Sequence, residues 1–248
     1  MTVSRLMRDV IEFCYPSACS VCRNVAEEGA FLCPTCLGQL EKLEAAGACE
    51  LCGMPAAHKD APCPFCKGEG VPHYRQILRL GTFDAPLKEL IHQFKYHRRW
   101  SLGEQLAERL LGHGPVQGML ADADVLVPVP LHFVRQFWRG YNQAGIIARH
   151  LSKKVGVPTA SPLRRVRNTE TQTQLSSRAK RFKNLQGAFA LVRPEAIRGK
   201  RVVVVDDVMT TEATLQTVAR ALRPAKPASL GALVLAVADP RGRAFQYV

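Results

Sequence analysis

Eight of the nine cysteines follow a spacing pattern that occurs twice within the first 66 residues, and no other feature constrains the fold as strongly. Each copy reads C-x2-C-x10-C-P-x-C, and the second copy begins 30 residues after the first. Four thiolates at this spacing suit one tetrahedral zinc ion, because a two-residue spacer lets a tight turn present both sulfurs to one metal. The repeat therefore predicts two zinc sites, formed by Cys19, Cys22, Cys33, Cys36, Cys49, Cys52, Cys63 and Cys66.

The sequence leaves other uses of these cysteines open. Disulfides need an oxidising compartment, and the first residues mix Arg8, Asp9 and Glu12 with apolar residues, so we expect a cytoplasmic protein without a signal peptide. An iron–sulfur cluster also takes four thiolates. One zinc per copy is the simplest pairing, although crossed pairing between the copies is also compatible. Four sulfur ligands close the coordination sphere, so the predicted metals are structural rather than catalytic.

The charge changes sign along the chain. Residues 1–70 carry a net charge of −3 and residues 71–248 carry +16, with 16 basic against two acidic residues in the stretch 131–201. We therefore predict an N-terminal helix with a double zinc ribbon at 1–70 and a second domain at 71–248, each with its own core. Such a concentrated positive field favours polyanions or multiply phosphorylated ligands. The plain alternative is the solvated surface of a basic protein.

Residues 71–248 alternate between apolar runs and amphipathic helical patterns. Strands are predicted at 75–84, 123–130 and 229–238 and in the segment 200–207, where the strand runs into a loop at the two acids. Helices are predicted at 86–97, 101–113, 142–155 and 213–222. The strands are apolar throughout, which favours an α/β fold, a parallel sheet with helices on both faces, preceded by the small zinc-ribbon module. No apolar run reaches the ~18 residues that a membrane-spanning helix needs, so we expect no membrane insertion.

A polar stretch, DDVMTTEAT, follows the apolar run that ends at residue 205. Ligands of such sheets bind beyond the carboxyl ends of the strands, which is where Asp206 and Asp207 are expected. Thr210, Thr211 and Thr214 then precede a helix N-terminus, whose free N–H groups and dipole favour an anion. The arrangement suits a ribose 5-phosphate, with the diol on the acids and the phosphate on the turn. A charged turn with threonine caps is the alternative.

The motifs, in their order and spacing, resemble the competence protein F (ComF) family and its type I phosphoribosyltransferase-like domain. The resemblance is carried by the cysteine pairs, DVLVPVPL (124–131), RGYNQA (139–144), RRVRNTETQTQLSSRAKRFKN (164–184), GAF (187–189) and VVVVDDVMTTEATL (202–215). It implies a role in DNA uptake and natural transformation, with single-stranded DNA and DNA-uptake proteins as partners. It also implies a site for 5-phosphoribosyl 1-pyrophosphate (PRPP), or another phosphorylated ribose, used with Mg²⁺ if the chain is an active phosphoribosyltransferase.

The resemblance also implies roles for individual residues. Asp206 and Asp207 match the acidic pair that binds the ribose hydroxyls. The 5-phosphate loop matches Thr210, Thr211, Glu212, Ala213 and Thr214. The pyrophosphate-binding loop falls on Pro128, Val129, Pro130 and Leu131. The basic and mobile-loop residues are Arg139, Arg164, Arg165, Arg167, Gln172 and Arg178, with Thr169 as a further match. No residue stands out as a catalytic base, and the acceptor is unknown.

Glu212 departs from the family pattern, which has glycine at this position. A left-handed backbone there would cost a glutamate ~1–2 kcal/mol, and its carboxylate would repel a phosphate. We therefore expect weakened phosphate binding, and an affinity gain of about ten-fold or more on replacement by glycine.

Aromatic residues within the basic stretch suggest a stacking contact with a nucleic acid. Phe133, Phe137, Trp138 and Tyr141 offer stacking faces for the bases of single-stranded DNA. Core packing is nevertheless the favoured interpretation for most of them. A further alternative is a partner-binding protein whose ribbons dock other uptake components.

Overall fold

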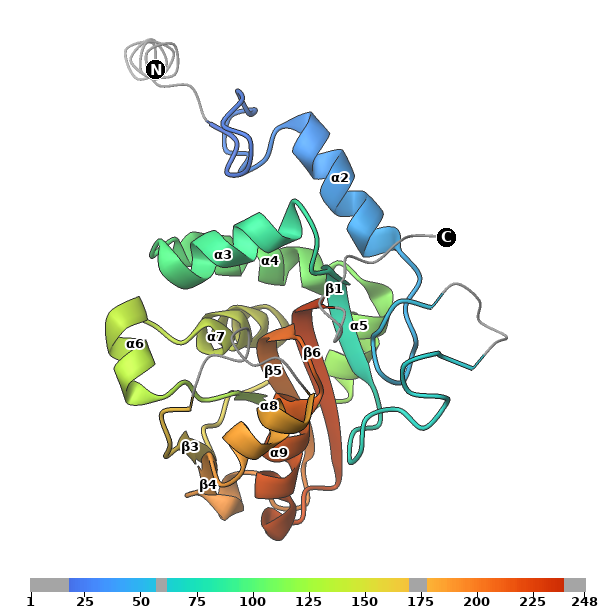
Figure 1. The fold of residues 1–248 in the computed structure, drawn as a ribbon, viewed down its shortest axis with the longest axis vertical. Helices are drawn as coiled ribbons and strands as arrows, with labels where there is room; N and C mark the ends of the chain where they lie inside the picture. Colours follow the sequence, from blue (N-terminus) through green and yellow to red (C-terminus); the bar gives the residue numbers. More distant parts are fainter. Residues whose placement is uncertain (1–17, 57–61, 170–177, 239–248) are drawn as a thin grey trace.

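The computed structural model describes residues 18–56, 62–169 and 178–238, so the helix predicted before the ribbons lies outside the described residues. A parallel sheet with the strand order β1-β6-β5-β2 forms its centre (Figure 1). The strands are β1 (Ile77–Thr82), β2 (Val125–Pro128), β5 (Arg201–Met209) and β6 (Ser229–Val237). Within the described ranges, no helix combines the length and the apolar character that crossing a membrane requires.

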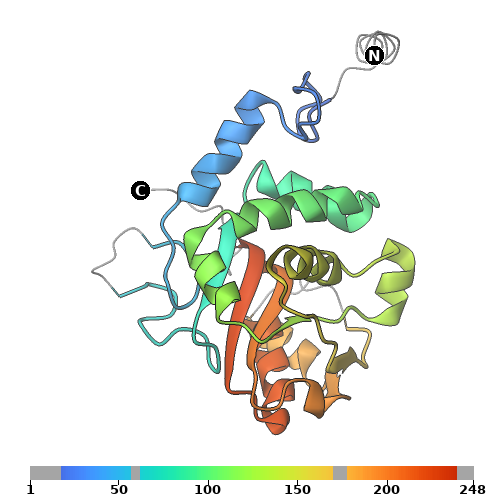
Figure 2. The same ribbon diagram turned by 180° about the vertical axis from the view of Figure 1, so that it is seen from behind.

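Helices cover both faces of the sheet, which confirms the predicted fold class. Alternate valines of β5 point to opposite faces, so that Val203 and Val205 join one apolar cluster and Val202 and Val204 the other. The first face packs against α3 (Leu87–Tyr96), α4 (Trp100–Leu111), α5 (Gly114–Ala121) and α7 (Gln143–Val155). The second packs against α8 (Arg178–Leu185) and α9 (Ala213–Leu222), as the opposite views in Figures 1 and 2 show.

The eight predicted strands and helices are all present, but one boundary is wrong. Strand β5 continues to Met209, so Asp206 and Asp207 lie inside the strand rather than in a loop after it. The reason is the neighbouring strand, since β6 supplies ladder partners as far as Val237. Several elements had no prediction: α2 (Pro34–Ala45), α5, α6 (Phe133–Arg139), α8, the antiparallel pair β3 (Leu163–Arg165) and β4 (Phe189–Leu191), and the short 3-10 helices Pro194–Ala196 and Arg223–Ala225.

The zinc ribbons do not have cores of their own. Leu40 and Leu43 of α2 share one apolar cluster with the first face of the sheet. Three of the four cysteines of the first tetrad belong to the same cluster, whereas the fourth, Cys22, is exposed. Met54, Val71 and Tyr74 share the other cluster with the second face. The expectation of separate cores is therefore wrong, because a ribbon this short buries its apolar residues only against a larger element. The boundary near residue 70 stays a prediction.

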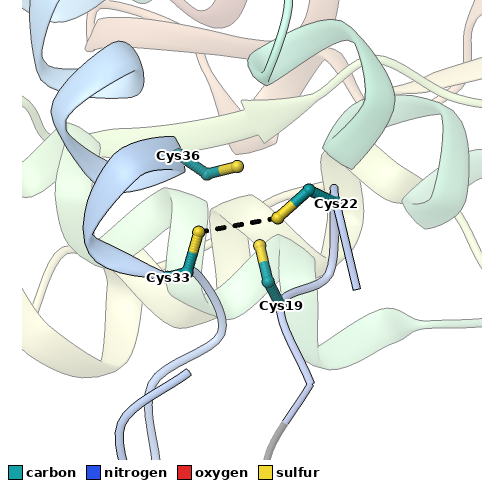
Figure 3. Close-up of side chains that lie close together, drawn as sticks. All are labelled: Cys19, Cys22, Cys33 and Cys36. Carbon is teal, nitrogen blue, oxygen red and sulfur yellow. Dashed lines mark hydrogen bonds between the residues drawn. The ribbon is translucent and has the colours of Figure 1, made fainter. Parts of the chain in front are cut away.

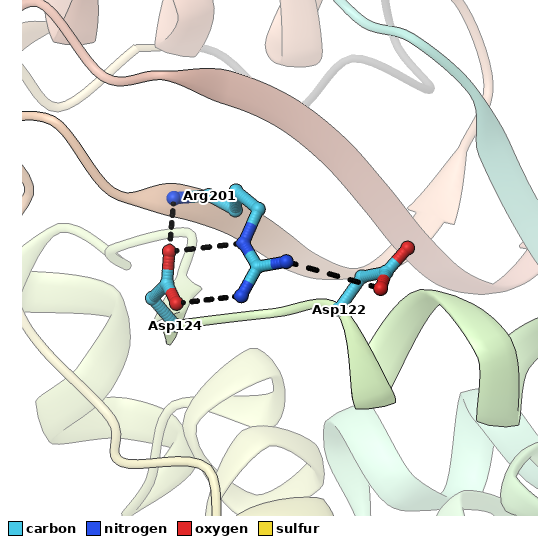
Figure 4. Close-up of polar contacts among 3 residues, drawn as sticks. All are labelled: Asp122, Asp124 and Arg201. Atoms are coloured by element: carbon cyan, nitrogen blue, oxygen red, sulfur yellow. Dashed lines mark hydrogen bonds and ion pairs between the residues drawn. The ribbon is translucent and has the colours of Figure 1, made fainter.

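An ion pair fixes the register at the amino ends of β2 and β5. Asp124 Oδ2 accepts a hydrogen bond of 2.7 Å from the backbone N–H of Arg201, and its Oδ1 accepts one of 2.9 Å from Nη2 of the same residue (Figure 4). These hydrogen bonds lower the pKa of Asp124 to about 2. The same register places Pro128 opposite Val205, so the carboxyl ends of the two strands lie together.

Candidate functional site

Each copy of the cysteine repeat forms its own tetrad. In both tetrads the four Sγ atoms lie within 4.8 Å of one another. The Sγ atoms of Cys22 and Cys33 are 3.6 Å apart (Figure 3), and those of Cys52 and Cys63 are 3.7 Å apart. A tetrahedral zinc ion with Zn–S bonds of about 2.3 Å needs sulfurs about 3.8 Å apart, so the geometry fits. The pairing is sequential, which excludes crossed pairing.

Local backbone geometry presents these sulfurs. The residue after each first knuckle is left-handed, with φ of 68° at Arg23 and 72° at Gly53. Within the first knuckle the N–H of Val21 points at the Sγ of Cys19, 3.4 Å away. Pro34 then starts α2 directly after Cys33, a position that suits proline because its missing N–H is not needed there. Both tetrads are structural zinc sites, since four sulfurs leave no open position.

A cavity of about 150 Å³ lies at the carboxyl ends of β2 and β5. It brings together predicted residues from four separate motifs: Asp206, Asp207, Thr210, Thr214, Val129, Pro130, Leu131, Arg139 and Arg165. Its lining also includes side chains that had no predicted role, namely Lys95, Tyr96 and Arg135. The cavity therefore places an acidic pair opposite several cations.

Charge and burial act strongly on the acidic pair. Burial and the neighbouring Asp207 raise the pKa of Asp206 to about 7. The Nζ of Lys95 lies 2.7 Å from Oδ1 of Asp207, and the backbone N–H of Asp207 donates to Oδ1 of Asp206 at 2.9 Å. Asp206 and Asp207 are thus neighbours in β5 that both line the cavity, with Lys95 paired to the second of them.

Three arginines approach the same cavity. Arg165 Nη2 donates to Oγ1 of Thr169 at 2.5 Å, and Arg135 donates to the carbonyl oxygen of Thr169. Burial and the nearby charge of Arg135 lower the pKa of Arg165 to about 10. Arg139 lies over the Tyr96 ring, 4.9 Å from its centroid, and donates to Gln143 Oε1 at 3.1 Å. Guanidinium groups gathered in this way suit a ligand with several phosphate oxygens.

The predicted 5-phosphate loop divides between the cavity and the core. Thr210 and Thr214 line the cavity, whereas Thr211 and Ala213 are buried beside it. Glu212 occupies the N-cap position of α9 with φ −64° and ψ −4°, which is right-handed helical geometry. Its Oε2 accepts a hydrogen bond of 3.0 Å from Nε2 of Gln216, and the residue does not line the cavity. The expected backbone penalty at Glu212 is therefore wrong.

The remaining predicted residues lie in different places. Pro128 ends β2, and the loop after it is held by Asn142, whose Nδ2 donates to the carbonyl oxygen of Val129 at 3.0 Å. Asn142 occupies the N-cap position of α7, but its side chain makes no cap hydrogen bond. Arg164 and Arg167 are exposed and do not line the cavity. Gln172 lies outside the described residues, as does the side chain of Arg178, the first residue of α8.

The aromatic residues of α6 are exposed, contrary to the favoured core interpretation. Phe133, Phe137 and Trp138 are 73%, 80% and 75% exposed, and no residue of α6 is buried. Both ribbon views show α6 at the outer edge of the molecule (Figures 1 and 2). Tyr141 alone follows the prediction, since it stacks on Phe94 at 5.6 Å and donates to its carbonyl oxygen.

Comparison with known proteins identifies the family. Residues 122–247 match the phosphoribosyl transferase domain model, and residues 10–67 match the double zinc ribbon domain model. "Competence protein F" of Haemophilus influenzae is 32% identical over 213 residues, which cover 83% of this chain and 90% of that protein. The chain belongs to the competence protein F family.

Two further relatives are similar to this chain to a comparable degree. "DNA utilization protein YhgH" of Salmonella typhimurium is 33% identical over 208 residues, covering 82% of this chain and 83% of its own. "Competence protein ComFC" of Bacillus subtilis is 28% identical over 211 residues, with 82% and 83% covered. Each alignment covers most of this chain and most of the relative, so the resemblance concerns the whole architecture rather than one motif.

The residues that the sequence did not single out share one property. Lys95 and Tyr96 come from α3, and Arg135 from α6, and each reaches the cavity through packing between distant segments. A signal was present in HQFKYHRRW at 92–100, where basic and aromatic residues alternate at the end of an amphipathic helix. That pattern alone indicates a solvated helix end as readily as a binding site.

Proposed function

We propose that this competence protein F family member acts in DNA uptake and natural transformation, where it handles single-stranded DNA in the cytoplasm together with other uptake proteins. The names of its relatives, two competence proteins and a DNA utilization protein, support the biological process. The observation that carries the DNA contact is the exposed aromatic face of α6, formed by Phe133, Phe137 and Trp138.

The chemistry of α6 fits a single strand. Exposed bases stack on aromatic side chains with about 1–3 kcal/mol each, whatever their sequence. Three large aromatic residues exposed on one short helix are unusual for a surface that faces only water. The helix FVRQFWR also carries two arginines and no acidic residue, so its field attracts the phosphate backbone. Arg164 and Arg167 add exposed positive charge in the same basic stretch.

Titration of a fluorescent oligothymidine at two salt concentrations tests this proposal. Phe137→Ala with Trp138→Ala should weaken binding about ten-fold or more at either salt concentration, because stacking does not release counterions. Arg164→Gln with Arg167→Gln should reduce the slope of log affinity against log salt by about 1.4, at about 0.7 for each phosphate contact.

The matched control removes two exposed arginines elsewhere, Arg220→Gln with Arg223→Gln at the end of α9. It should leave the slope closer to wild type than the test pair does. No binding at low salt, or an equal change of slope in control and test pair, would contradict DNA binding by this surface.

The cavity favours a second function, the binding of PRPP or another phosphorylated ribose and, as an enzyme, phosphoribosyl transfer. Asp206 and Asp207 would accept hydrogen bonds from the ribose hydroxyls. Thr210, directly after β5, and Thr214, in the first turn of α9, would bind the 5-phosphate. The arginines would neutralise pyrophosphate as its bond to the anomeric carbon breaks and the acceptor bonds to that carbon. PRPP would enter as its Mg²⁺ complex.

Calorimetry with PRPP and Mg²⁺, and separately with ribose 5-phosphate, tests the second function. Asp206→Asn with Asp207→Asn should abolish binding, because amides are weaker acceptors than carboxylates and bring donors into the site. Asp122→Asn is the matched control, since Asp122 is exposed at the opposite end of the sheet (Figure 4). If the wild-type protein binds neither ligand, sugar-phosphate binding is contradicted and the domain serves only as a structural scaffold.

A further inference from the structure

Among the basic residues that line the cavity, Lys95 is the one that comes from outside both family-model matches. It lies near the end of α3, between the double zinc ribbon match at 10–67 and the phosphoribosyl transferase match at 122–247. We infer that Lys95 is a ligand-binding residue of the sugar-phosphate cavity and that the first zinc ribbon positions it. This inference rests on the proposed binding of a phosphorylated ribose.

The geometry places Lys95 where a ligand must meet it. Its Nζ lies 2.7 Å from Oδ1 of Asp207, and the two side chains are only 19% and 15% exposed. An ammonium group that is mostly removed from water needs a partner, and Asp207 is that partner. A ribose hydroxyl that donates a hydrogen bond to Asp207 occupies acceptor positions of the carboxylate that Lys95 otherwise uses. The ammonium group then has N–H donors to give to an oxygen of the ligand.

The charges around the cavity indicate that Lys95 attracts an anionic ligand rather than blocking its binding. Asp206 and Asp207 are the acids in the lining, and Arg135, Arg139 and Arg165 accompany Lys95 as cations. The positive charges outnumber the negative ones, so an anion gains from Lys95. The lysine also lowers the proton affinity of the neighbouring Asp206, opposing the effect of burial on its pKa.

The first zinc ribbon holds α3 through a small hydrogen-bond network. Gln93 Nε2 donates to the carbonyl oxygen of Ser20, a residue between two zinc ligands of the first tetrad. Arg99 donates to Gln93 Oε1 at 2.6 Å and to Ser20 Oγ at 2.9 Å. Phe94 is buried in the same cluster as Leu40 of α2. The ribbon therefore contacts α3 two residues before Lys95, and Gln93 is a positioning residue for it.

Calorimetry with ribose 5-phosphate compares wild type with Lys95→Met, Lys95→Arg and Lys88→Met. Lys95→Met should weaken binding by on the order of ten-fold to a hundred-fold, the range of a hydrogen bond to a charged group. Lys95→Arg should recover part of the loss, because it restores the charge. Lys88 lies on the same helix but is exposed and outside the cavity lining, so Lys88→Met should bind as wild type does.

A double-mutant cycle tests the role of the ribbon. Gln93→Leu should weaken binding in the wild-type background and have little further effect in the Lys95→Met background, because it acts through the lysine. Equal effects in both backgrounds would overturn the positioning role. Unchanged or tighter binding by Lys95→Met would overturn the binding role, since Lys95 would then only compete with the ligand for Asp207. A wild-type protein without affinity would overturn the proposed sugar-phosphate binding as well.

Discussion

Replacement of Cys52 by serine should destabilise the sheet as well as the second zinc ribbon. Cys52 is fully buried, and its cluster includes Met54 and Val71 of the ribbon segment together with Leu230 and Val234 of β6. Loss of the zinc ion removes the constraint that holds the ribbon segment folded. Apolar residues of that segment then leave the sheet, which exposes part of its second face.

The structure sets the scale of this effect. Releasing Met54 and Val71, which are 2% and 1% exposed, costs roughly 3–6 kcal/mol at about 1.5–3 kcal/mol for each side chain. Tyr74 loses the hydrogen bond of 2.9 Å from its hydroxyl to the carbonyl oxygen of Leu215 in α9, which adds about 1 kcal/mol. Domains are commonly stable by about 5–15 kcal/mol, so these terms are a large fraction of the total.

Thermal unfolding followed by circular dichroism, with elemental analysis for zinc, measures the outcome. We expect the zinc content to fall from two ions to one per chain and Tm to fall by roughly 8–28 °C, at about 2–4 °C for each kcal/mol in a chain of this length. Glu50→Ser is the matched control, since Glu50 is exposed in the same knuckle and is not a ligand. It should retain both metals and the wild-type Tm. Loss of one zinc ion with an unchanged Tm would refute the shared core and restore two independent domains.

Two further predictions concern the acidic residues near the cavity. Glu212→Gln should raise the affinity for ribose 5-phosphate by no more than about five-fold, the usual scale for one solvent-screened charge. Glu212→Gly should do no better in calorimetry, because φ of −64° needs no glycine, and a ten-fold advantage of glycine over glutamine would contradict this account. Asp206 has a pKa raised from 3.8 to about 7, so the native protein binds more protons than the unfolded chain between about pH 4 and 7 and loses stability as the pH rises through that window. Asp206→Asn should flatten this fall in urea unfolding measured from pH 4 to 8, and an unchanged slope would show that Asp206 titrates normally.

Patterns that depend only on neighbours in the chain could be predicted from the sequence. The cysteine spacing determined both zinc sites, because two knuckles and the short chain between them suffice to bring four sulfurs around one metal. Apolar runs and helical periodicity located the four strands of the parallel sheet and the helices α3, α4, α7 and α9. The apolar run also placed Asp206 and Asp207 towards the carboxyl end of a central strand, where ligand sites of parallel sheets form, although the strand continues past them to Met209.

Contacts between distant segments were decided only by the tertiary structure. A helical pattern shows which residues share a face but not what that face meets, so Lys95 gave no sign of its ion pair with Asp207. The aromatic residues of α6 look like core residues in the sequence, yet they are exposed because α6 contacts the rest of the fold through Arg135 and Arg139 rather than through an apolar face. The burial of the ribbons' apolar residues was decided in the same way, since they pack against the two faces of a sheet whose strands come from later in the chain.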